Sequence, residues 1–287
     1  MIIGAHLSIS RGYPAAAREA AKLNLDGFQY FTRNPRGGAV RHLADEEAAA
    51  FRRAREEAGL RAVIAHLPYT VNLGSSEPRL VEFAAQVVRE DTERARRLGA
   101  ELVVTHPGHF GSDGREAGLE RVVRVLQEGL GEVEDGPAFC LETMAGQGHE
   151  IGGTLEELAA AIKVLEPVVR VGLCLDSAHL FAAGWDLRTW PGIDRLVERI
   201  DKLVGWDRVR ALHLNDTKAA LGSHRDRHEL IGRGQLGRDG IKAIVTHPAL
   251  GRLPLFLETP VGDYKEYAAE AALVRELAGL TKTETKE

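Results

Sequence analysis

Short apolar segments recur along the whole chain, separated by longer segments in which apolar residues return at helical spacing. The short segments are rich in Val, Ile, Leu and Phe and do not alternate with polar residues. That pattern is typical of strands buried on both faces, as in a parallel sheet. We therefore expect eight strands, at residues 2–7, 27–31, 62–67, 102–106, 138–143, 171–176, 209–214 and 253–259.

The segments between these strands predict helices. Residues 78–98 place their apolar side chains on one face, and Gly99 follows as a residue that can end the helix. Thr154 and Glu157 have the spacing of a capping box, which predicts a helix after the fifth strand. Further helices are expected over 14–23, 44–58, 115–131, 192–204, 238–248 and 264–279.

Eight strands that alternate with eight helices predict a (β/α)8 TIM barrel. The alternative is a doubly wound open sheet, but no G-x-G-x-x-G motif follows the first strand. No Pro-, Gly- or Ser-rich linker divides the chain, so we expect a single domain over 1–280. The short charged tail 281–287 is expected to be disordered.

Composition narrows the class of protein. The chain has no apolar run of 18 residues and no visible export signal, so we expect a cytoplasmic protein without a membrane span. Cys140 and Cys174 both lie in apolar segments, which is typical of buried thiols without disulfides. The net charge of −5 argues mildly against a nucleic-acid partner, but three divalent ions would change it to about +1.

Six consecutive predicted strands carry, as their last or next-to-last residue, a residue that can bind a metal ion. In a barrel the carboxyl ends of the strands surround a single mouth, where active sites of this fold lie. One histidine at the end of a strand is often an ordinary core or loop residue, whereas six such residues in series are not expected by accident. These residues are His66, His106, Glu142, Asp176, His213 and Glu258.

Two loops add a second cluster. Asp176 and His179 are three residues apart in the first turn of a predicted helix, so Asp176 can face inward while His179 reaches outward. Asp226 and His228 are two residues apart, and side chains at that spacing in an extended segment point to the same side. We expect His179, Asp226 and His228 to converge.

The predicted ligands are five histidines and four carboxylates, which suits three ions with one bridging carboxylate. Zinc is favoured over magnesium because more than half of the ligands are imidazoles, and manganese is an alternative at one site. Such a site generates a hydroxide nucleophile between two ions and stabilises both the attacking and the leaving oxygen of a phosphoryl displacement.

Three segments are more specific than the general pattern. They read ETMAGQG at 142–148, LDSAHLFAAGWD at 175–186, and HLNDTK followed by GSxxDRH at 213–228. With these segments in this order, the whole chain resembles the endonuclease IV type of apurinic/apyrimidinic (AP) endonuclease.

The resemblance implies three zinc sites, with Glu142 as the bridging catalytic carboxylate. The first site is formed by His66, His106 and Glu142, the second by Glu142, Asp176, His213 and Glu258, and the third by His179, Asp226 and His228.

The resemblance also implies the reaction. The family cleaves double-stranded DNA on the 5′ side of an abasic site, leaves a 3′-hydroxyl and a 5′-deoxyribose phosphate, and trims blocked 3′ ends. A metal-bridged hydroxide attacks the phosphate, and the third metal stabilises the leaving oxygen. We expect a monomer that needs no nucleotide cofactor.

Two residues are expected to contact DNA. By resemblance, Arg36 and Tyr69 insert into the duplex and help expose the abasic sugar, although both could be ordinary surface residues. The chain departs from the family pattern at Gly37 and Gly38, where many members carry a Trp shortly after the Arg. His109 is expected to contact phosphate or support the site rather than to bind a metal.

Two other functions remain open at this stage. Sugar isomerases and epimerases of the related barrel fold use one or two divalent metals, and a third cluster has no role in them. A metal-stabilised protein could also bind lesions without turnover, but two clustered ions with open coordination argue for catalysis. Nicking of abasic duplex, interconversion of ketose and aldose, and binding without nicking distinguish the three.

Overall fold

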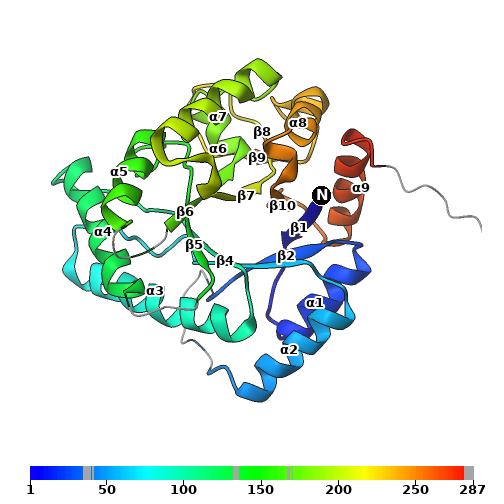
Figure 1. Cartoon of the computed structure of the whole chain (residues 1–287), viewed down its shortest axis with the longest axis horizontal. Helices are drawn as coiled ribbons and strands as arrows, with labels where there is room; N and C mark the ends of the chain where they lie inside the picture. Colours follow the sequence, from blue (N-terminus) through cyan, green and yellow to red (C-terminus); the bar gives the residue numbers. More distant parts are fainter. Residues whose placement is uncertain (35–39, 41, 132–135, 167–168, 170, 281–287) are drawn as a thin grey trace, which may run out of the picture.

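Eight parallel strands close into a barrel, and helices surround it on the outside (Figure 1). A computed structural model of the protein describes residues 1–34, 40, 42–131, 136–166, 169 and 171–280. Around the barrel the strands follow the order β1-β10-β7-β6-β5-β4-β3-β2. Their bounds are β1 Ile2–His6, β2 Gly27–Phe31, β3 Ala62–His66, β4 Leu102–Thr105, β5 Ala138–Glu142, β6 Val171–Asp176, β7 Val209–His213 and β10 Pro254–Leu257. The predicted TIM barrel is thereby confirmed.

Every predicted helix is present in the described residues. The helices are α1 Tyr13–Lys22, α2 Asp45–Glu57, α3 Pro78–Leu98, α4 Arg115–Leu130, α5 Leu155–Leu165, α6 Ser177–Ala182, α7 Trp190–Val204, α8 Gly237–Thr246 and α9 Lys265–Leu277, with 3₁₀ turns at Trp206–Arg208 and Leu250–Arg252. None of the helices that the structure describes is long and apolar enough to cross a membrane.

Only one of the two hydrogen bonds of the predicted capping box is present. The Thr154 hydroxyl accepts a hydrogen bond from the Glu157 backbone N–H at 3.3 Å, as expected. The Glu157 carboxylate instead accepts from the Gly152 N–H at 2.7 Å and pairs with Arg115. The helix start is therefore capped by Thr154 and is also tied to the preceding loop through the Glu157 side chain.

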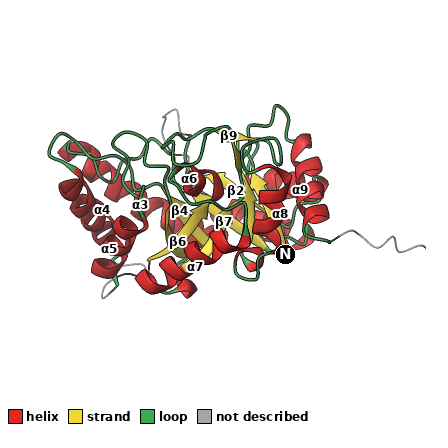
Figure 2. Ribbon diagram, turned by 90° about the horizontal axis from the view of Figure 1, so that it is seen from above, coloured by secondary structure: helices red, strands yellow, loops and turns green. Residues whose placement is uncertain are grey.

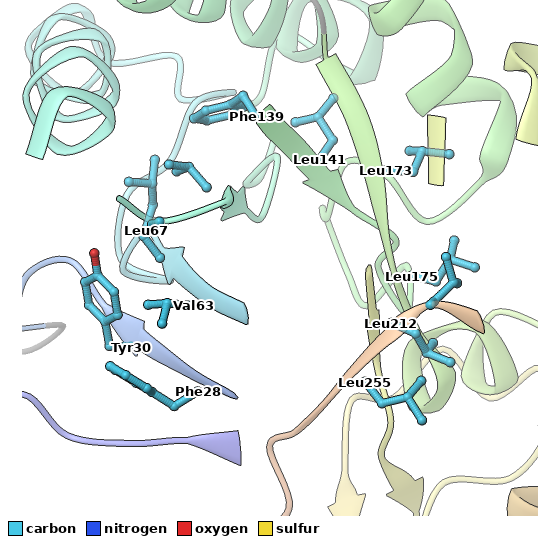
Figure 3. Packing of buried hydrophobic residues seen from close by; sticks show 14 of the residues in the cluster. Phe28, Tyr30, Val63, Leu67, Phe139, Leu141, Leu173, Leu175, Leu212 and Leu255 are labelled. Atoms are coloured by element: carbon cyan, nitrogen blue, oxygen red, sulfur yellow. The ribbon is translucent and has the colours of Figure 1, made fainter. Parts of the chain in front are cut away.

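Alternation along the strands produces two apolar layers. Side chains that point outward pack with the helices in one large cluster, and Figure 3 shows members of it from β2, β3, β5, β6, β7 and β10. The residues between them form a smaller cluster inside the barrel, namely Ala62, Ile64, Leu102, Val104, Cys140, Cys174, Ala211 and Phe256. The Phe256 ring fills the space beside β1, where a Cβ on Gly4 would lie 2.6 Å from it.

The loops at the carboxyl ends of the strands form a layer over the barrel, with β9 among them (Figure 2). Residues 215–228, predicted as a loop, contain β8 Asp216–Thr217, which pairs antiparallel with β9 His228–Glu229. The buried carboxylate of Asp216 accepts hydrogen bonds from the backbone N–H groups of Gly234 and Leu236. This pairing was not predicted, because strands of two residues carry no alternation that a sequence can reveal.

Two earlier predictions lie outside the described residues. These are the loop that contains Arg36, Gly37 and Gly38, and the tail 281–287. The single domain over 1–280 stays a prediction.

Candidate metal centre

The six ligand-type residues at the strand ends occupy one layer of the barrel interior. Each follows a residue of the inner apolar cluster by two positions, as His66 follows Ile64 and Glu142 follows Cys140. Because the side-chain period of a strand is two, these six residues must point to the same side as the inner cluster. The closed sheet therefore carries a polar layer directly above its apolar core.

Glu142 lies at the centre of this layer and is fully buried. Its Oε2 lies 3.0 Å from His66 Nε2 and 3.3 Å from His106 Nε2. Its Oε1 lies 3.2 Å from His213 Nδ1 and 3.2 Å from His179 Nδ1. Each oxygen thus faces a different set of imidazoles, which is the arrangement that a bridging carboxylate requires.

The second group is built around His213. Its Nδ1 lies 3.3 Å from Glu258 Oε2 and 4.0 Å from Asp176 Oδ2, in addition to its contact with Glu142. Potential ligand atoms of Glu142, Asp176, His213 and Glu258 all lie within 4.8 Å of one another, as do those of His66, His106 and Glu142. Both groups match the predicted sets.

The third group differs in one respect from the predicted set. His179 Nε2 lies 3.4 Å from Asp226 Oδ2, and His228 Nε2 lies 3.3 Å from Asp226 Oδ1. Each Asp226 oxygen therefore faces a different histidine, and the residues whose ligand atoms cluster within 4.8 Å are Asp176, His179 and His228. Asp176 Oδ2 is 3.8 Å from His228 Nε2, so Asp176 adjoins two groups, as Glu142 does.

Hydrogen bonds to the protein orient several of the imidazoles. The Nδ1 atoms of His66, His179 and His228 lie within hydrogen-bond distance of backbone carbonyls, at 2.6 Å from Leu67 O, 2.9 Å from Thr143 O and 3.3 Å from Glu258 O. A ring whose Nδ1–H donates to a carbonyl presents the lone pair of Nε2. All three rings therefore present Nε2 to the centre.

Neighbouring histidines hold two of the carboxylates, Glu142 and Asp226, in the ionised form. Burial raises the pKa of Glu142, but the charges of His213 and His106 outweigh burial and hold this pKa well below its usual range. Burial likewise raises the pKa of Asp226, and the neighbouring His179 and His228 outweigh it, lowering the pKa to about 2. Burial lowers the pKa of His179, and Asp176, Asp226 and Glu142 reverse this effect and raise the pKa well above its usual value.

The residues present fit metal ions. Among the described residues, four buried atoms that face the centre have no hydrogen-bond partner: Glu142 Oε1, His179 Nε2, His213 Nδ1 and His228 Nε2. Buried polar atoms are almost always paired, so an unpaired set that converges needs a ligand. Imidazole nitrogens and carboxylate oxygens are the donors that zinc takes.

Sequence reasoning missed the polar residues that hold the ligands. Asn215 donates from Nδ2 to Asp176 at 2.7 Å and accepts from the Glu258 N–H at 2.8 Å. The Thr143 hydroxyl accepts from the Asp176 N–H at 2.9 Å. Gln29 contacts both His213 and Glu258. Thr143 and Asn215 lie within two residues of predicted ligands, which could have drawn attention to them, whereas Gln29 lies next to none in the sequence.

Of the two residues predicted to contact DNA, only Tyr69 lies in the described part of the structure. Tyr69 is 54% exposed at the mouth, with its ring 5.9 Å from that of Phe31. Arg36 lies outside the described residues. The His109 backbone N–H donates to Asn72 Oδ1 at 2.8 Å, which fixes its loop and leaves the role of the ring a prediction.

Comparison with known proteins adds independent findings. A family model described as a xylose isomerase-like TIM barrel matches residues 17–283. A curated relative from Moorella thermoacetica, named probable endonuclease 4, is 51% identical over 278 residues, which are 96% of this chain and 99% of that protein. Endonuclease IV from Thermus thermophilus has a similar crystal structure, with a TM-score of 0.85 at 33% identity, covering 98% of this chain and 100% of that one.

A sugar-epimerase-like structure shares the fold alone. The structure of a D-tagatose 3-epimerase-like protein matches with a TM-score of 0.73 at 18% identity, covering 98% of both chains. The barrel is thus common to both kinds of protein, and the high identity lies with the endonucleases.

Proposed function

This chain belongs to the endonuclease IV family, and from that premise we propose that it cleaves the DNA backbone on the 5′ side of abasic sites. It is a hydrolase that acts on DNA. The proposed products are a 3′-hydroxyl and a 5′-deoxyribose phosphate, and the same site is proposed to trim blocked 3′ ends. The proposed enzyme acts on double-stranded DNA as a monomer and needs no nucleotide cofactor.

The observation that carries the proposal is the position of Glu142 between two groups of ligands. Its Oε2 faces His66 and His106, and its Oε1 faces His213. We propose that three zinc ions bind here, one to His66, His106 and Glu142, one to Glu142, Asp176, His213 and Glu258, and one to His179, Asp226 and His228. When bound, such ions activate water and stabilise charge on the oxygens of a phosphate in displacement.

The protein's own part is to hold these groups in place before DNA binds. The backbone carbonyls that accept from His66, His179 and His228 fix the direction of each ring. Asp176 is held at both oxygens, because Oδ1 accepts from the His179 N–H at 2.7 Å and Oδ2 accepts from Asn215. A site held in this way needs little reorganisation during the reaction.

The net charge of the proposed ligands together with three bound metal ions would favour a phosphate substrate. The nine proposed ligands include four carboxylates, and three divalent ions leave about +2 at the mouth. The charge is therefore concentrated where a DNA phosphate would enter, although the whole chain is acidic.

An assay with three substrates tests this function. Purified zinc-loaded protein is incubated with an abasic duplex, an intact duplex of the same sequence, and a nicked duplex with a blocked 3′ end. We expect cleavage 5′ of the abasic site, removal of the 3′ block and no cleavage of intact DNA. Interconversion of a ketose and an aldose without any nicking would instead support the sugar isomerase alternative.

Tyr69→Ala is expected to impair lesion recognition and leave the metals bound. An inserted aromatic ring offsets lost stacking by about 1–3 kcal/mol, by analogy with bases stacked on aromatic side chains. Arg36→Ala is expected to act in the same way. The measurements are zinc content and the ratio of affinities for abasic and intact duplex.

Phe83→Ala provides the control, since Phe83 is 46% exposed on α3 and is not proposed to contact DNA. If Tyr69→Ala and Arg36→Ala discriminate between the two duplexes as well as this control does, both residues are ordinary surface residues.

A further inference from the structure

Gln29 is a fully buried amide in the middle of β2, inside the barrel and beside the proposed second zinc site. Its Nε2 donates to the Glu258 carboxylate and lies 3.0 Å from His6 Nδ1. Its Oε1 lies 2.8 Å from His213 Nε2. One side chain therefore touches two proposed ligands of the same ion.

The chemistry of Glu258 decides how this amide is oriented. A carboxylate that binds a metal is ionised and can only accept hydrogen bonds, so the amide NH₂ must face Glu258. The amide oxygen then faces His213, and an amide oxygen can only accept. His213 must consequently carry a proton on Nε2.

This proton determines which nitrogen of His213 is free to bind. With Nε2–H donated to Gln29, the lone pair of neutral His213 is on Nδ1. That atom lies 3.2 Å from Glu142 Oε1 and 3.3 Å from Glu258 Oε2, and it has no hydrogen-bond partner among the described residues.

His213 is held differently from its neighbours. His66, His179 and His228 each have Nδ1 beside a backbone carbonyl and Nε2 facing the centre. In His213 the roles of the two nitrogens are exchanged, and the acceptor is a side chain. Its orientation therefore depends on one replaceable residue, whereas the other three depend on the backbone.

We propose that Gln29 is a positioning residue that fixes the tautomer of His213 and the carboxylate of Glu258, so that both are ready to bind the second zinc ion. The inference rests on the proposed zinc-dependent function. It adds a residue that is neither a ligand nor a substrate contact. Outer partners of metal-binding histidines typically change metal affinity or activity by about 10–100-fold.

The test uses two substitutions of Gln29 and one matched control. Gln29→Met keeps the length of the side chain and removes both hydrogen bonds. Gln29→Glu keeps an oxygen that accepts from His213 and loses the donor to Glu258. The control is Tyr30→Phe, which removes a buried hydroxyl from the next residue of β2, and that hydroxyl has no hydrogen-bond partner among the described residues.

Zinc affinity is measured by competition with a chromophoric chelator, and single-turnover cleavage of abasic duplex is measured on the same samples. NMR of protein with ¹⁵N-labelled histidine reports the protonation of the His213 ring. We expect Gln29→Met to weaken binding of one zinc ion by about 10–100-fold, to slow cleavage, and to lose the Nε2–H signal of His213. Gln29→Glu should keep the Nε2–H signal of His213 but recover only part of the zinc affinity, because it places a second carboxylate against Glu258. Tyr30→Phe should match the wild type.

Two results would overturn the inference. Gln29→Met could bind zinc as tightly as the wild type, or it could keep the Nε2–H signal of His213, in which case Gln29 does not fix the tautomer of that ring. Cleavage of abasic DNA by the zinc-loaded wild type distinguishes a failure of this inference from a failure of the proposed function. If zinc-loaded wild type cleaves abasic DNA and only the variants behave unexpectedly, the inference alone fails.

Discussion

Glu142→Gln is expected to lower the single-turnover rate of cleavage at an abasic site by at least about 10²-fold, the lower scale for disturbing an essential catalytic group. The substitution keeps the size of the side chain nearly constant. Glu142 faces His66 and His106 through Oε2 and His213 through Oε1. The substitution removes the negative charge that would let this one side chain bind an ion in each of the two groups. A neutral amide cannot bridge two cations with two anionic oxygens.

The measurement is the cleavage rate beside zinc content, with Glu101→Gln as the control. The Glu101 carboxylate accepts from the Val63 N–H at 2.7 Å and pairs with Arg55, away from the ligand layer, so its loss should leave the rate unchanged. Near-normal turnover in Glu142→Gln would transfer the bridging role to another carboxylate. Asp176 is the candidate, because it adjoins the second and third groups.

The second large effect is expected from the double variant Asp226→Ala, His228→Ala. It should bind about two zinc ions instead of three, still recognise abasic duplex, and cleave it on the order of 10²–10³-fold more slowly, the range for losing one group that stabilises developing charge. His179, Asp226 and His228 would hold the proposed third ion, and its charge would stabilise the leaving 3′ oxygen. Because that stabilisation would act more strongly on the transition state than on bound substrate, its loss should appear in the rate rather than in binding.

The matched control removes another Asp–His pair, with Asp194→Ala and His247→Ala. His247 Nε2 lies 3.1 Å from Asp194 Oδ1, and neither residue belongs to a ligand group. This control should keep three zinc ions and full activity. If the Asp226, His228 variant keeps all three ions, or loses one and cleaves normally, the third group is not a catalytic metal site.

The barrel and the ligand layer were predictable because both follow from the period of a strand. His66, Glu142, Asp176 and His213 are the last residues of their strands, so a correct strand assignment places them at one mouth. Parallel strands buried on both faces also have a strong sequence signal, and each predicted strand formed within two residues of its expected ends.

Details that depend on loop side chains were not predictable. Spacing placed Asp226 and His228 together correctly, but it could not show that the two Asp226 oxygens face different histidines. It also could not show that Asp176 adjoins the third group. Gln29 was missed because a lone polar residue in an apolar strand has no sequence signal, and its importance arises only from contacts with β7 and with the segment after β10.

Removal and return of zinc tests the central claim most directly. The protein is treated with a strong chelator, freed of it by exchange, and analysed for metal beside cleavage of a duplex with one abasic site. We predict that cleavage is abolished together with the metals and that zinc restores both without added magnesium or nucleotide. Full-rate cleavage of abasic DNA by exhaustively demetallated protein would contradict the account.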